Sequence, residues 1–456
     1  MKSILSGVVS VFLLLGCSTI EPELSLDVEI AKEYAAKSYA KQKLQERWWE
    51  SFGSDELNTL IDQALEQSPD ILSAYEKIQQ AKIILNSAGA EYLPSLDLRA
   101  NTSLGDNSDR GKIESSSASV ALSYELDIWD RIGASQRAAK SSLEVSLYDY
   151  EALKITLCTD VAQSYFHYVA TVQKEKITQK NLQIAKDTLD VLQARYDFGA
   201  VDELSLRRQK IAYLAQEELL YSLQNQRVLY KNALALLLGK NPSSFALKAD
   251  AIETLLMPEV DAGLPSELLL SRPDIAAAQA SIEANKALIQ AANANRFPRF
   301  SLSGSGGLAS DDLLSLNNAT RSVDVGLGLT YNIFDMGRLK NQVLIEESKA
   351  KQSLQNYRKS LLNAFGEVED TLNSLAMNKK HLTLTEQKVQ EAKQSFKLAT
   401  IQYQNGSIDF TTYLEAQKSY FSAQEELVSK TDAQLQSLVL LHKVLGGGWR
   451  GKIESE

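Results

Sequence analysis

The feature that most constrains this chain is a run of 65 residues, 134–198, that contains neither glycine nor proline. A continuous α-helix of that length measures about 100 Å, because each residue adds about 1.5 Å. Such a helix gains most of its stability from packing against neighbours rather than from its own propensity. We therefore expect long helices that pair along their sides as in coiled coils.

The chain also repeats itself. Pro69 and Pro273 begin similar segments 204 residues apart, and Tyr124 and Tyr331 lie 207 residues apart in a second pair. The matching segments are 68–98 with 272–302, 122–133 with 329–340, and 195–202 with 402–409. Self-similarity of this kind predicts a tandem duplication in which each repeat is one structural unit.

Each repeat predicts the same order of elements. A helix follows the proline, which suits a first helical turn. Two strands come next, then the long helix, a turn at glycine and a returning helix. The two shorter helices, of 23 and 37 residues, together nearly match the long one of 65, so we expect them to stack end to end. The expected strands are 96–104, 119–129, 300–306 and 323–334, and the expected long helices are 134–198, 202–238, 338–405 and 409–445.

The strands alternate between apolar and polar residues. In SVDVGLGLTYNIF, 322–334, Val323 and Val325 begin an apolar face, whereas Asp324 and Gly326 begin a polar one. Strict alternation predicts a strand with one apolar and one polar face. The polar segment 104–117, rich in Gly and Ser, is expected to be the loop that joins the first strand pair.

Four such strands per chain do not close a membrane barrel, because the smallest barrels have eight. Open sheet edges do not face lipid, since their backbone groups lack partners there. We therefore expect other copies of the chain to complete the barrel, two copies giving eight strands and three giving twelve. A soluble two-sheet module is the alternative.

The N-terminus predicts export and lipidation. Lys2 precedes an apolar segment, 4–15, which is typical of a cleaved signal peptide. The segment ends in LLGC, 14–17, which resembles a bacterial lipobox with an unusually bulky Leu15. The resemblance implies a diacylglycerol and an N-acyl chain on Cys17, and several acyl chains together give stable anchoring. An uncleaved or unlipidated signal is the alternative.

Composition excludes several function classes. The net charge of −10 argues against nucleic acid as a partner. The chain has no apolar run of about 18 residues, so we expect no transmembrane helix. His167, His381 and His442 lack carboxylates or cysteines at ligand spacing, and Cys158 alone remains after Cys17. We expect no enzyme activity, no metal site and no cofactor other than the covalent lipid.

Five segments resemble the outer membrane efflux proteins, the TolC/OprM-type outer membrane factors, in the lipoprotein branch that serves resistance–nodulation–division efflux systems. The segments are RWWESFGSDELNTLIDQALEQSPDI (47–71), YELDIWDRIG (124–133), SRPDI (271–275), FPRFSLSGSGG (297–307) and YNIFDMGR (331–338). The resemblance implies a mixed α and β membrane protein, a homotrimer with a twelve-stranded outer-membrane barrel continued by an α-helical barrel across the periplasm.

The resemblance also implies a division of the chain. Residues 1–16 are the signal peptide, 17–54 a lipid-anchored equatorial segment and 55–239 the first repeat. An equatorial segment, 240–271, a second repeat, 272–446, and a tail, 447–456, follow.

The function implied is a passive exit duct in the outer membrane, in contact with its lipids. A periplasmic adaptor would couple it to an energised inner-membrane pump of the resistance–nodulation–division type. The cargo would be small molecules such as drugs, toxic compounds or metal ions. The alternatives are an outer channel for peptide or protein secretion, and a non-conducting structural coiled-coil lipoprotein that spans the periplasm.

The hairpin ends are the candidate contacts with the adaptor, as the resemblance implies. Gly199 and Gly406 suit the turns because glycine adopts left-handed conformations readily. Asp202 and Asp409 begin the returning helices, where a carboxylate caps free N–H groups. Capping alone is the simpler explanation of both aspartates.

A periplasmic gate is the remaining candidate site. Glu415 lies nine residues after Gly406, where the resembling family places an acidic residue near the pore axis. Lys418 and Tyr403 are its candidate partners. A solvated Glu415–Lys418 helix pair is the alternative, and the first repeat has Arg208 at the position equivalent to Glu415. Trp129 is expected either to mark the membrane boundary or to pack at the strand-to-helix corner.

Overall fold

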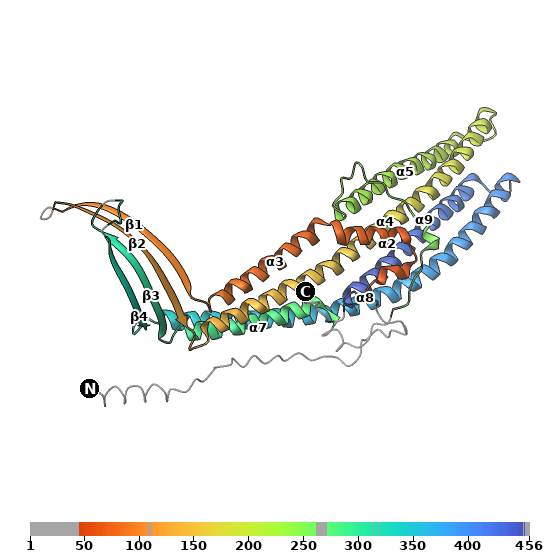
Figure 1. The fold of residues 1–456 in the computed structure, drawn as a ribbon. Coiled ribbons are helices and arrows are strands. Elements are labelled where there is room, and N and C mark those ends of the chain that lie inside the picture. Colours follow the sequence, from red (N-terminus) through yellow and green to blue (C-terminus); the bar gives the residue numbers. More distant parts are fainter. Residues whose placement is uncertain are drawn as a thin grey trace. The chain divides into compact units, whose positions relative to one another are not determined.

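The structure, a computed structural model, describes residues 45–107, 111–260, 271–312, 314–317, 319–449 and 451. Cys17 and the signal peptide lie outside the described residues, as do parts of the predicted equatorial segments. Within the described residues, 77–147 and 277–359 form one compact unit, and 45–76, 148–260, 271–276 and 360–451 form the other. The elements recur in the same order in both halves of the chain, as the duplication predicts (Figure 1).

The first unit contains one antiparallel sheet in the order β1-β2-β3-β4. The strands are β1 (Ser95–Asn107), β2 (Gly111–Leu126), β3 (Arg299–Ser310) and β4 (Thr320–Thr330). Figure 1 shows them as one curved sheet. β2 of the first repeat pairs with β3 of the second, so the two repeats share a continuous ladder.

The register confirms the predicted faces. Leu98 lies opposite Val120, which lies opposite Gly306, and Gly306 lies opposite Val323. Neighbouring side chains in such rows share a face, because successive residues of a strand point to opposite sides. The polar residues form rows of their own, such as Asp97–Ala121–Ser305–Asp324.

The strand ends differ from the prediction at several points. The segment expected as a loop, 104–117, is mostly strand, and hydroxyl pairs such as Ser103–Ser115, 2.8 Å apart, connect its two sides. β3 likewise continues past the expected end at 306 to Ser310.

β4 ends at Thr330 rather than at Phe334, and β2 ends at Leu126 rather than at Trp129. Thr330 pairs with Arg299. The residue before Arg299 is Pro298, which has no N–H group with which to extend the ladder.

The helices confirm the predicted lengths closely. The long ones are α4 (Arg131–Asp197) and α8 (Arg338–Gln404), each of 67 residues. Their returning partners are α5 (Glu203–Leu237) and α9 (Phe410–Val444), each of 35 residues. The two shorter helices are α3 (Pro69–Ala90) and α7 (Pro273–Ala294), each of 22 residues. The remaining elements are η1 (Trp48–Phe52), α2 (Asp55–Gln67) and η2 (Ile252–Thr254).

The shorter helices stack end to end in both repeats, as expected from their summed length. Gly239, just after α5, has a φ of +68°, and a Cβ there would lie 2.8 Å from the carbonyl oxygen of Gln67, which ends α2, and 3.0 Å from Cδ of Pro69, which begins α3. In the second repeat a Cβ on Gly446 would lie 1.9 Å from the Ser271 carbonyl oxygen. Arg272 also donates to the Val444 carbonyl oxygen at 3.0 Å. Glycine is therefore required where the end of each returning helix meets the next helix.

The core of the second unit is aromatic. Trp48, Phe52 and Phe166 are nearly fully buried. His442 stacks on Trp48 with ring centroids 4.8 Å apart. His167 is on α4, and its Nδ1 lies 2.8 Å from a carboxylate oxygen of Asp432 on α9. These contacts confirm the packing interpretation of Trp48 and of His167, and Cys158 is buried in the same core.

We expect the substitution His442→Phe to remove part of the acid sensitivity of this core. Burial lowers the pKa of His442 from 6.5 to about 3. Between these values the unfolded chain binds a proton that the folded chain excludes, so stability declines as the pH falls from 6.5 toward 3. A phenylalanine keeps the stacked ring and does not titrate. The measurement is the apparent melting temperature of the solubilised protein at about pH 7.5 and about pH 4.5.

The exposed His381 provides the matched control, and His381→Phe should retain the full acid sensitivity of the parent. An equal loss of melting temperature on acidification in parent and His442→Phe would contradict the assignment.

Candidate functional site

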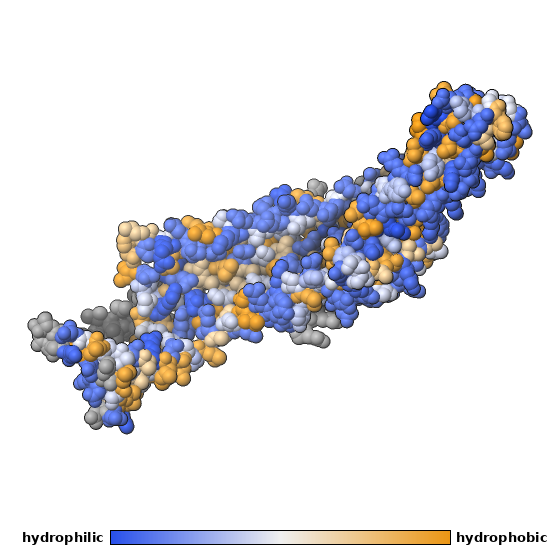
Figure 2. Space-filling model, turned by 90° about the horizontal axis from the view of Figure 1, so that it is seen from above, coloured by the Kyte–Doolittle hydropathy of each residue, from blue (hydrophilic) through white to orange (hydrophobic). Residues whose placement is uncertain are grey.

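The sheet exposes the whole of its apolar face. Val323 is 82% exposed, Val325 80% and Leu98 77%. Figure 2 shows hydrophobic residues gathered over the strands, at the left of the view. An apolar surface of this extent marks contact with a membrane or with another protein. The opposite face carries small polar residues: Ser119, Ser301, Ser303, Ser305, Gly326, Gly328 and Ser322 among others.

The two edge strands are open. Among the described residues β1 pairs only with β2, and β4 pairs only with β3, so each has one side without a strand partner there. No helix in the part of the chain that the structure describes is both long and apolar enough to cross a bilayer.

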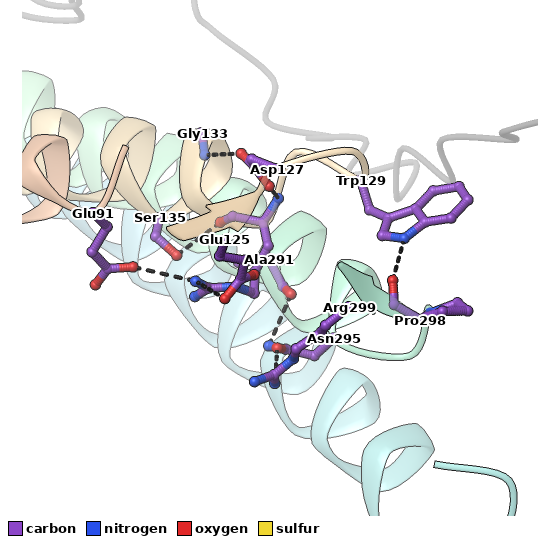
Figure 3. Close-up of polar contacts among 11 residues, drawn as sticks. Glu91, Glu125, Asp127, Trp129, Gly133, Ser135, Ala291, Asn295, Pro298 and Arg299 are labelled. Carbon is purple, nitrogen blue, oxygen red and sulfur yellow. Dashed lines mark hydrogen bonds and ion pairs between the residues drawn. The ribbon is translucent and has the colours of Figure 1, made fainter. Parts of the chain in front are cut away.

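A set of polar contacts in the first unit fixes the turn from β2 into α4 (Figure 3). Asp127 accepts hydrogen bonds from the backbone N–H groups of Arg131, at 2.7 Å, and Gly133, at 2.9 Å. It therefore caps the helix start. The Arg131 side chain donates to Glu125 at 2.9 Å and to Glu91 at 3.4 Å. This corner holds α4 in place relative to the end of its own strand.

Trp129 packs at the same corner. Its indole Nε1 donates to the Pro298 carbonyl oxygen at 2.7 Å, and its ring stacks on Phe297 at 4.8 Å between centroids. Figure 3 shows the ring beside Pro298, apart from the carboxylates around α4. The packing interpretation is therefore confirmed, and the indole is still half exposed. Its place at the strand end is also that of an interfacial aromatic.

The hairpin ends have the predicted turn chemistry. Gly199 and Gly406 both have a φ of +72°, a conformation that favours glycine. Asp202 accepts from the Ser205 N–H at 2.7 Å, and Asp409 from the Thr412 N–H at 2.8 Å. The hydrogen bond from the Ser205 backbone lowers the pKa of Asp202. Bonds from the side chain and backbone of Thr412 lower the pKa of Asp409. Both aspartates are helix caps, as expected.

The candidate gate residues lie on α8 and α9, the two helices of the second hairpin. Among the described residues, no hydrogen bond or ion pair joins them to one another. The Tyr403 ring stacks on Tyr413 at 5.2 Å, and the Arg195 guanidinium lies 5.5 Å from its centroid. The Tyr403 hydroxyl is buried without a hydrogen-bond partner among the described residues. Glu415 and Lys418 are exposed, and no ion pair joins them in the described part of the chain. Within one chain, Tyr403 is thus a packing residue.

The hairpins contact each other near their ends. Arg208, the first-repeat equivalent of Glu415, donates from Nη1 to the Thr411 hydroxyl at 2.6 Å. Leu192, Leu206, Phe410, Tyr413 and Leu414 form an apolar cluster beside it. This cluster joins residues of both repeats, so sequence reasoning within one repeat did not find it.

Two exposed apolar surfaces also escaped the sequence analysis. At the first hairpin end Phe198 is 90% exposed, whereas its second-repeat equivalent is Asn405. Exposed apolar residues also recur along α5 and α8 at steps of seven or a multiple of it, a spacing typical of an unpaired coiled-coil seam. On α5 they form two rows three residues apart, Leu204 with Ile211 and Leu214 with Tyr221 and Val228; on α8 they are Met377, Leu384 and Leu398. The seven-residue period is readable in the sequence.

Metal chemistry has no visible basis in the described ranges. They contain no group of three or more His, Cys, Asp or Glu side chains arranged to hold a metal ion.

Comparison with known proteins agrees with this geometry. The family model described as outer membrane efflux protein matches residues 60–240 and 264–447. The chain is 34% identical over 424 residues to the pyoverdine export outer membrane protein OpmQ of Pseudomonas aeruginosa, covering 89% of this chain and 88% of that protein. It is 29% identical over 425 residues to the cation efflux system protein CusC of Escherichia coli O6:H1, covering 90% of each.

The fold is similar to a solved channel. The crystal structure of the Campylobacter jejuni CmeC outer membrane channel matches with a TM-score of 0.85 at 24% identity, covering 94% of each chain. Together these matches show that the chain belongs to the outer membrane efflux protein family, whose members are channels of the outer membrane and not enzymes.

Proposed function

We propose that three copies of this chain form a passive exit duct through the outer membrane. The observation that carries the proposal is the sheet, with a continuous apolar face, a face of small polar residues, and two open edges. Pairing β4 of one copy with β1 of the next satisfies both edges and closes twelve strands. The apolar face then meets lipid and the polar face lines a wet lumen.

The helices support the same assembly. The apolar residues at steps of about seven along α5 and α8 have no partner helix among the described residues. Neighbouring copies supply such partners when they surround a common axis, and the result is an α-helical barrel. The helical barrel continues the strand barrel across the periplasm.

Energy and cargo selection come from partner proteins in this proposal. A periplasmic adaptor couples the duct to an inner-membrane pump of the resistance–nodulation–division type. The relatives' names refer to pyoverdine in one case and cations in another. The cargo proposed here is correspondingly broad, namely drugs, toxic compounds or metal ions that the pump delivers.

The hairpin ends around Gly199, Asp202, Gly406 and Asp409 are the proposed contacts with the adaptor. Their turns are fixed by the glycines and the aspartate caps, so they present a rigid surface. Phe198, 90% exposed, is the largest apolar group at the first hairpin end. An exposed aromatic of this kind is a typical anchor in a protein–protein interface.

Two further parts of the proposal concern the chain's organisation. The lipid on Cys17 anchors the mature N-terminus to the membrane, in addition to the barrel. The proposed equatorial segments, 17–54 and 240–271, flank the first repeat, and the tail 447–456 follows the second.

We expect the solubilised protein to cross-link to three copies and no further, and to conduct ions in a planar bilayer. The reason is that twelve strands enclose an aqueous lumen, whereas four leave two edges open. Chemical cross-linking and single-channel recording measure the two properties. A cross-linking ladder that stops at two would reject the trimer. A trimer without conductance would favour the non-conducting structural lipoprotein.

Replacement of Cys17 by serine should abolish lipid labelling of the protein, because only a thiol accepts the diacylglycerol group at a lipobox. Growth with a fatty-acid analogue followed by gel fluorescence measures the label. Cys158→Ser is the matched control and should label as the parent does, since Cys158 is buried in the core. Labelling of Cys17→Ser at the parental level would refute the anchor.

We also propose that three copies of Glu415 form an acidic ring at the narrow end of the duct, with Lys418 and Tyr403 beside them. Like charges held close together favour bound cations. Glu415→Gln should therefore lower the preference for cations over anions by about twofold or more, as read from reversal potentials in a salt gradient.

Glu386→Gln provides the control for this measurement, because Glu386 is an exposed glutamate on α8 without a role in the proposed ring. It should leave ion preference unchanged. An unchanged preference in Glu415→Gln as well would make Glu415 an ordinary surface residue.

A further inference from the structure

We propose that the strand-to-helix corner of the second repeat, 331–340, is a phospholipid-binding surface. It would insert apolar side chains among lipid tails and hold headgroup phosphates with adjacent cations. The inference rests on the proposed orientation of the duct, in which this corner lies at the periplasmic side of the membrane.

The large apolar side chains of this corner are unusually exposed to solvent. Ile333 is 90% exposed, Met336 83% and Phe334 79%. Three large apolar side chains this exposed within four positions form a patch that a soluble surface rarely carries.

The sheet register places this patch next to the lipid-facing surface. Thr330 pairs with Arg299, so the residues after Thr330 lie at the end of the sheet where Pro298 and Phe297 precede β3. Leu126 pairs with Phe300, which brings the end of β2 and Trp129 to the same end. Leu327 and Leu329 belong to the apolar face, and the patch follows directly after them.

The two repeats differ at this corner. In the first repeat Trp129 has a stacking partner in Phe297 and a hydrogen-bond acceptor in Pro298. Met336 occupies the position 207 residues after Trp129, and it is almost fully exposed. The first corner thus packs its large side chain, whereas the second projects it outward.

The backbone conformation at Met336 holds this side chain at the surface. Met336 has a φ of +58°, a conformation that is rare for residues other than glycine and costs free energy. Asp335 holds the turn by accepting from the N–H groups of Gly337 and Leu339, both at 3.0 Å. The backbone thus holds Met336 at the surface at a conformational cost.

Cations adjoin the patch in the sequence. Arg338 and Lys340 are exposed and form no ion pair in the described part of the chain, although Arg338 interacts electrostatically with the Asp335 carboxylate of the same turn. The Arg296 side chain donates to the Asn293 amide oxygen at 3.2 Å. Guanidinium and ammonium groups bind phosphate oxygens through charge-assisted hydrogen bonds. Apolar side chains beside such cations are typical of a membrane interface.

A second copy of the chain is the competing occupant. The proposed contacts between copies use β4 up to Thr330 and the α8 seam from Met377 to Leu398, and the patch lies between these two segments of the chain. Cores of protein–protein interfaces are depleted of charged residues, whereas this patch has two exposed cations within four positions of Met336. Lipid is the occupant that matches both the apolar groups and the cations.

The test is photo-cross-linking in cells. A benzophenone amino acid replaces Phe334, and mass spectrometry identifies what it captures after irradiation. We expect a phospholipid adduct at 334. The same probe at Leu384, which is 62% exposed on α8, should capture no phospholipid and serves as the matched control. Capture of a second copy of the chain at 334, or capture of nothing, would overturn the inference.

A second measurement tests the cations. Arg338→Gln combined with Lys340→Gln should lower the anionic phospholipid that co-purifies with the trimer by about threefold or more. Arg358→Gln combined with Lys359→Gln, a similarly exposed pair on α8, should not change it. Equal retention in both double variants would remove the phosphate-binding part of the inference.

Conductance of each variant separates this inference from the proposed function. A conducting channel without a lipid adduct at 334 rejects the lipid surface alone. A lipid adduct in a protein that does not conduct rejects the duct alone.

Discussion

The structure depends above all on hydrogen-bond partners for the backbone N–H and C=O groups of its four strands. Hydrocarbon offers no hydrogen-bond partner, so an unpaired N–H or C=O group in lipid is costly. The duplication supplies one of the three ladders within the sheet, because β2 of the first repeat pairs with β3 of the second across a ladder of eleven residues. β1 and β4 each keep one open side. In the proposed assembly these two open edges are complementary, because the β4 edge of one copy can pair with the β1 edge of the next. The apolar seams of α5 and α8 extend this complementarity to the helices.

The two repeats have the same backbone conformation at equivalent turns, whereas several of their surface side chains differ. The caps Asp202 and Asp409 accept nearly the same hydrogen bonds, and Gly199 and Gly406 have the same φ. Residues at the hairpin ends and at the strand-to-helix corners differ in character. Phe198 corresponds to Asn405, Arg208 to Glu415 and Trp129 to Met336. In a threefold assembly the two repeats alternate around the axis, so these differences give six hairpin ends of two kinds. Partners that bind one kind of hairpin can thereby distinguish it from the other.

Much of the fold was predictable because its signals are periodic. Alternation predicted both faces of the sheet, and the lack of glycine and proline predicted the long helices. The strand ends were not predictable in this way. Segment 104–117 has no apolar alternation, and it is strand because each side supplies the other with hydrogen bonds and hydroxyl contacts. The end of β4 is set by Pro298, which lies 32 residues earlier than Thr330 in the sequence. At the hairpin ends, spacing predicted the caps, whereas the Arg208–Thr411 bond and the Tyr403–Tyr413 stack depend on packing between helices.

The polar face of the sheet explains why one fold can serve different cargo. Its rows consist largely of serine, glycine and threonine, and these side chains are too short to build a pocket around a particular solute. A lumen of this kind keeps water and leaves room, but it supplies few groups that recognise a ligand. Pyoverdine and cations are different solutes, yet proteins named for the export of one and the efflux of the other resemble this chain over most of its length. In the proposed duct, we therefore assign cargo discrimination to the hairpin ends and to the proteins that meet them, since charged and aromatic side chains are exposed there.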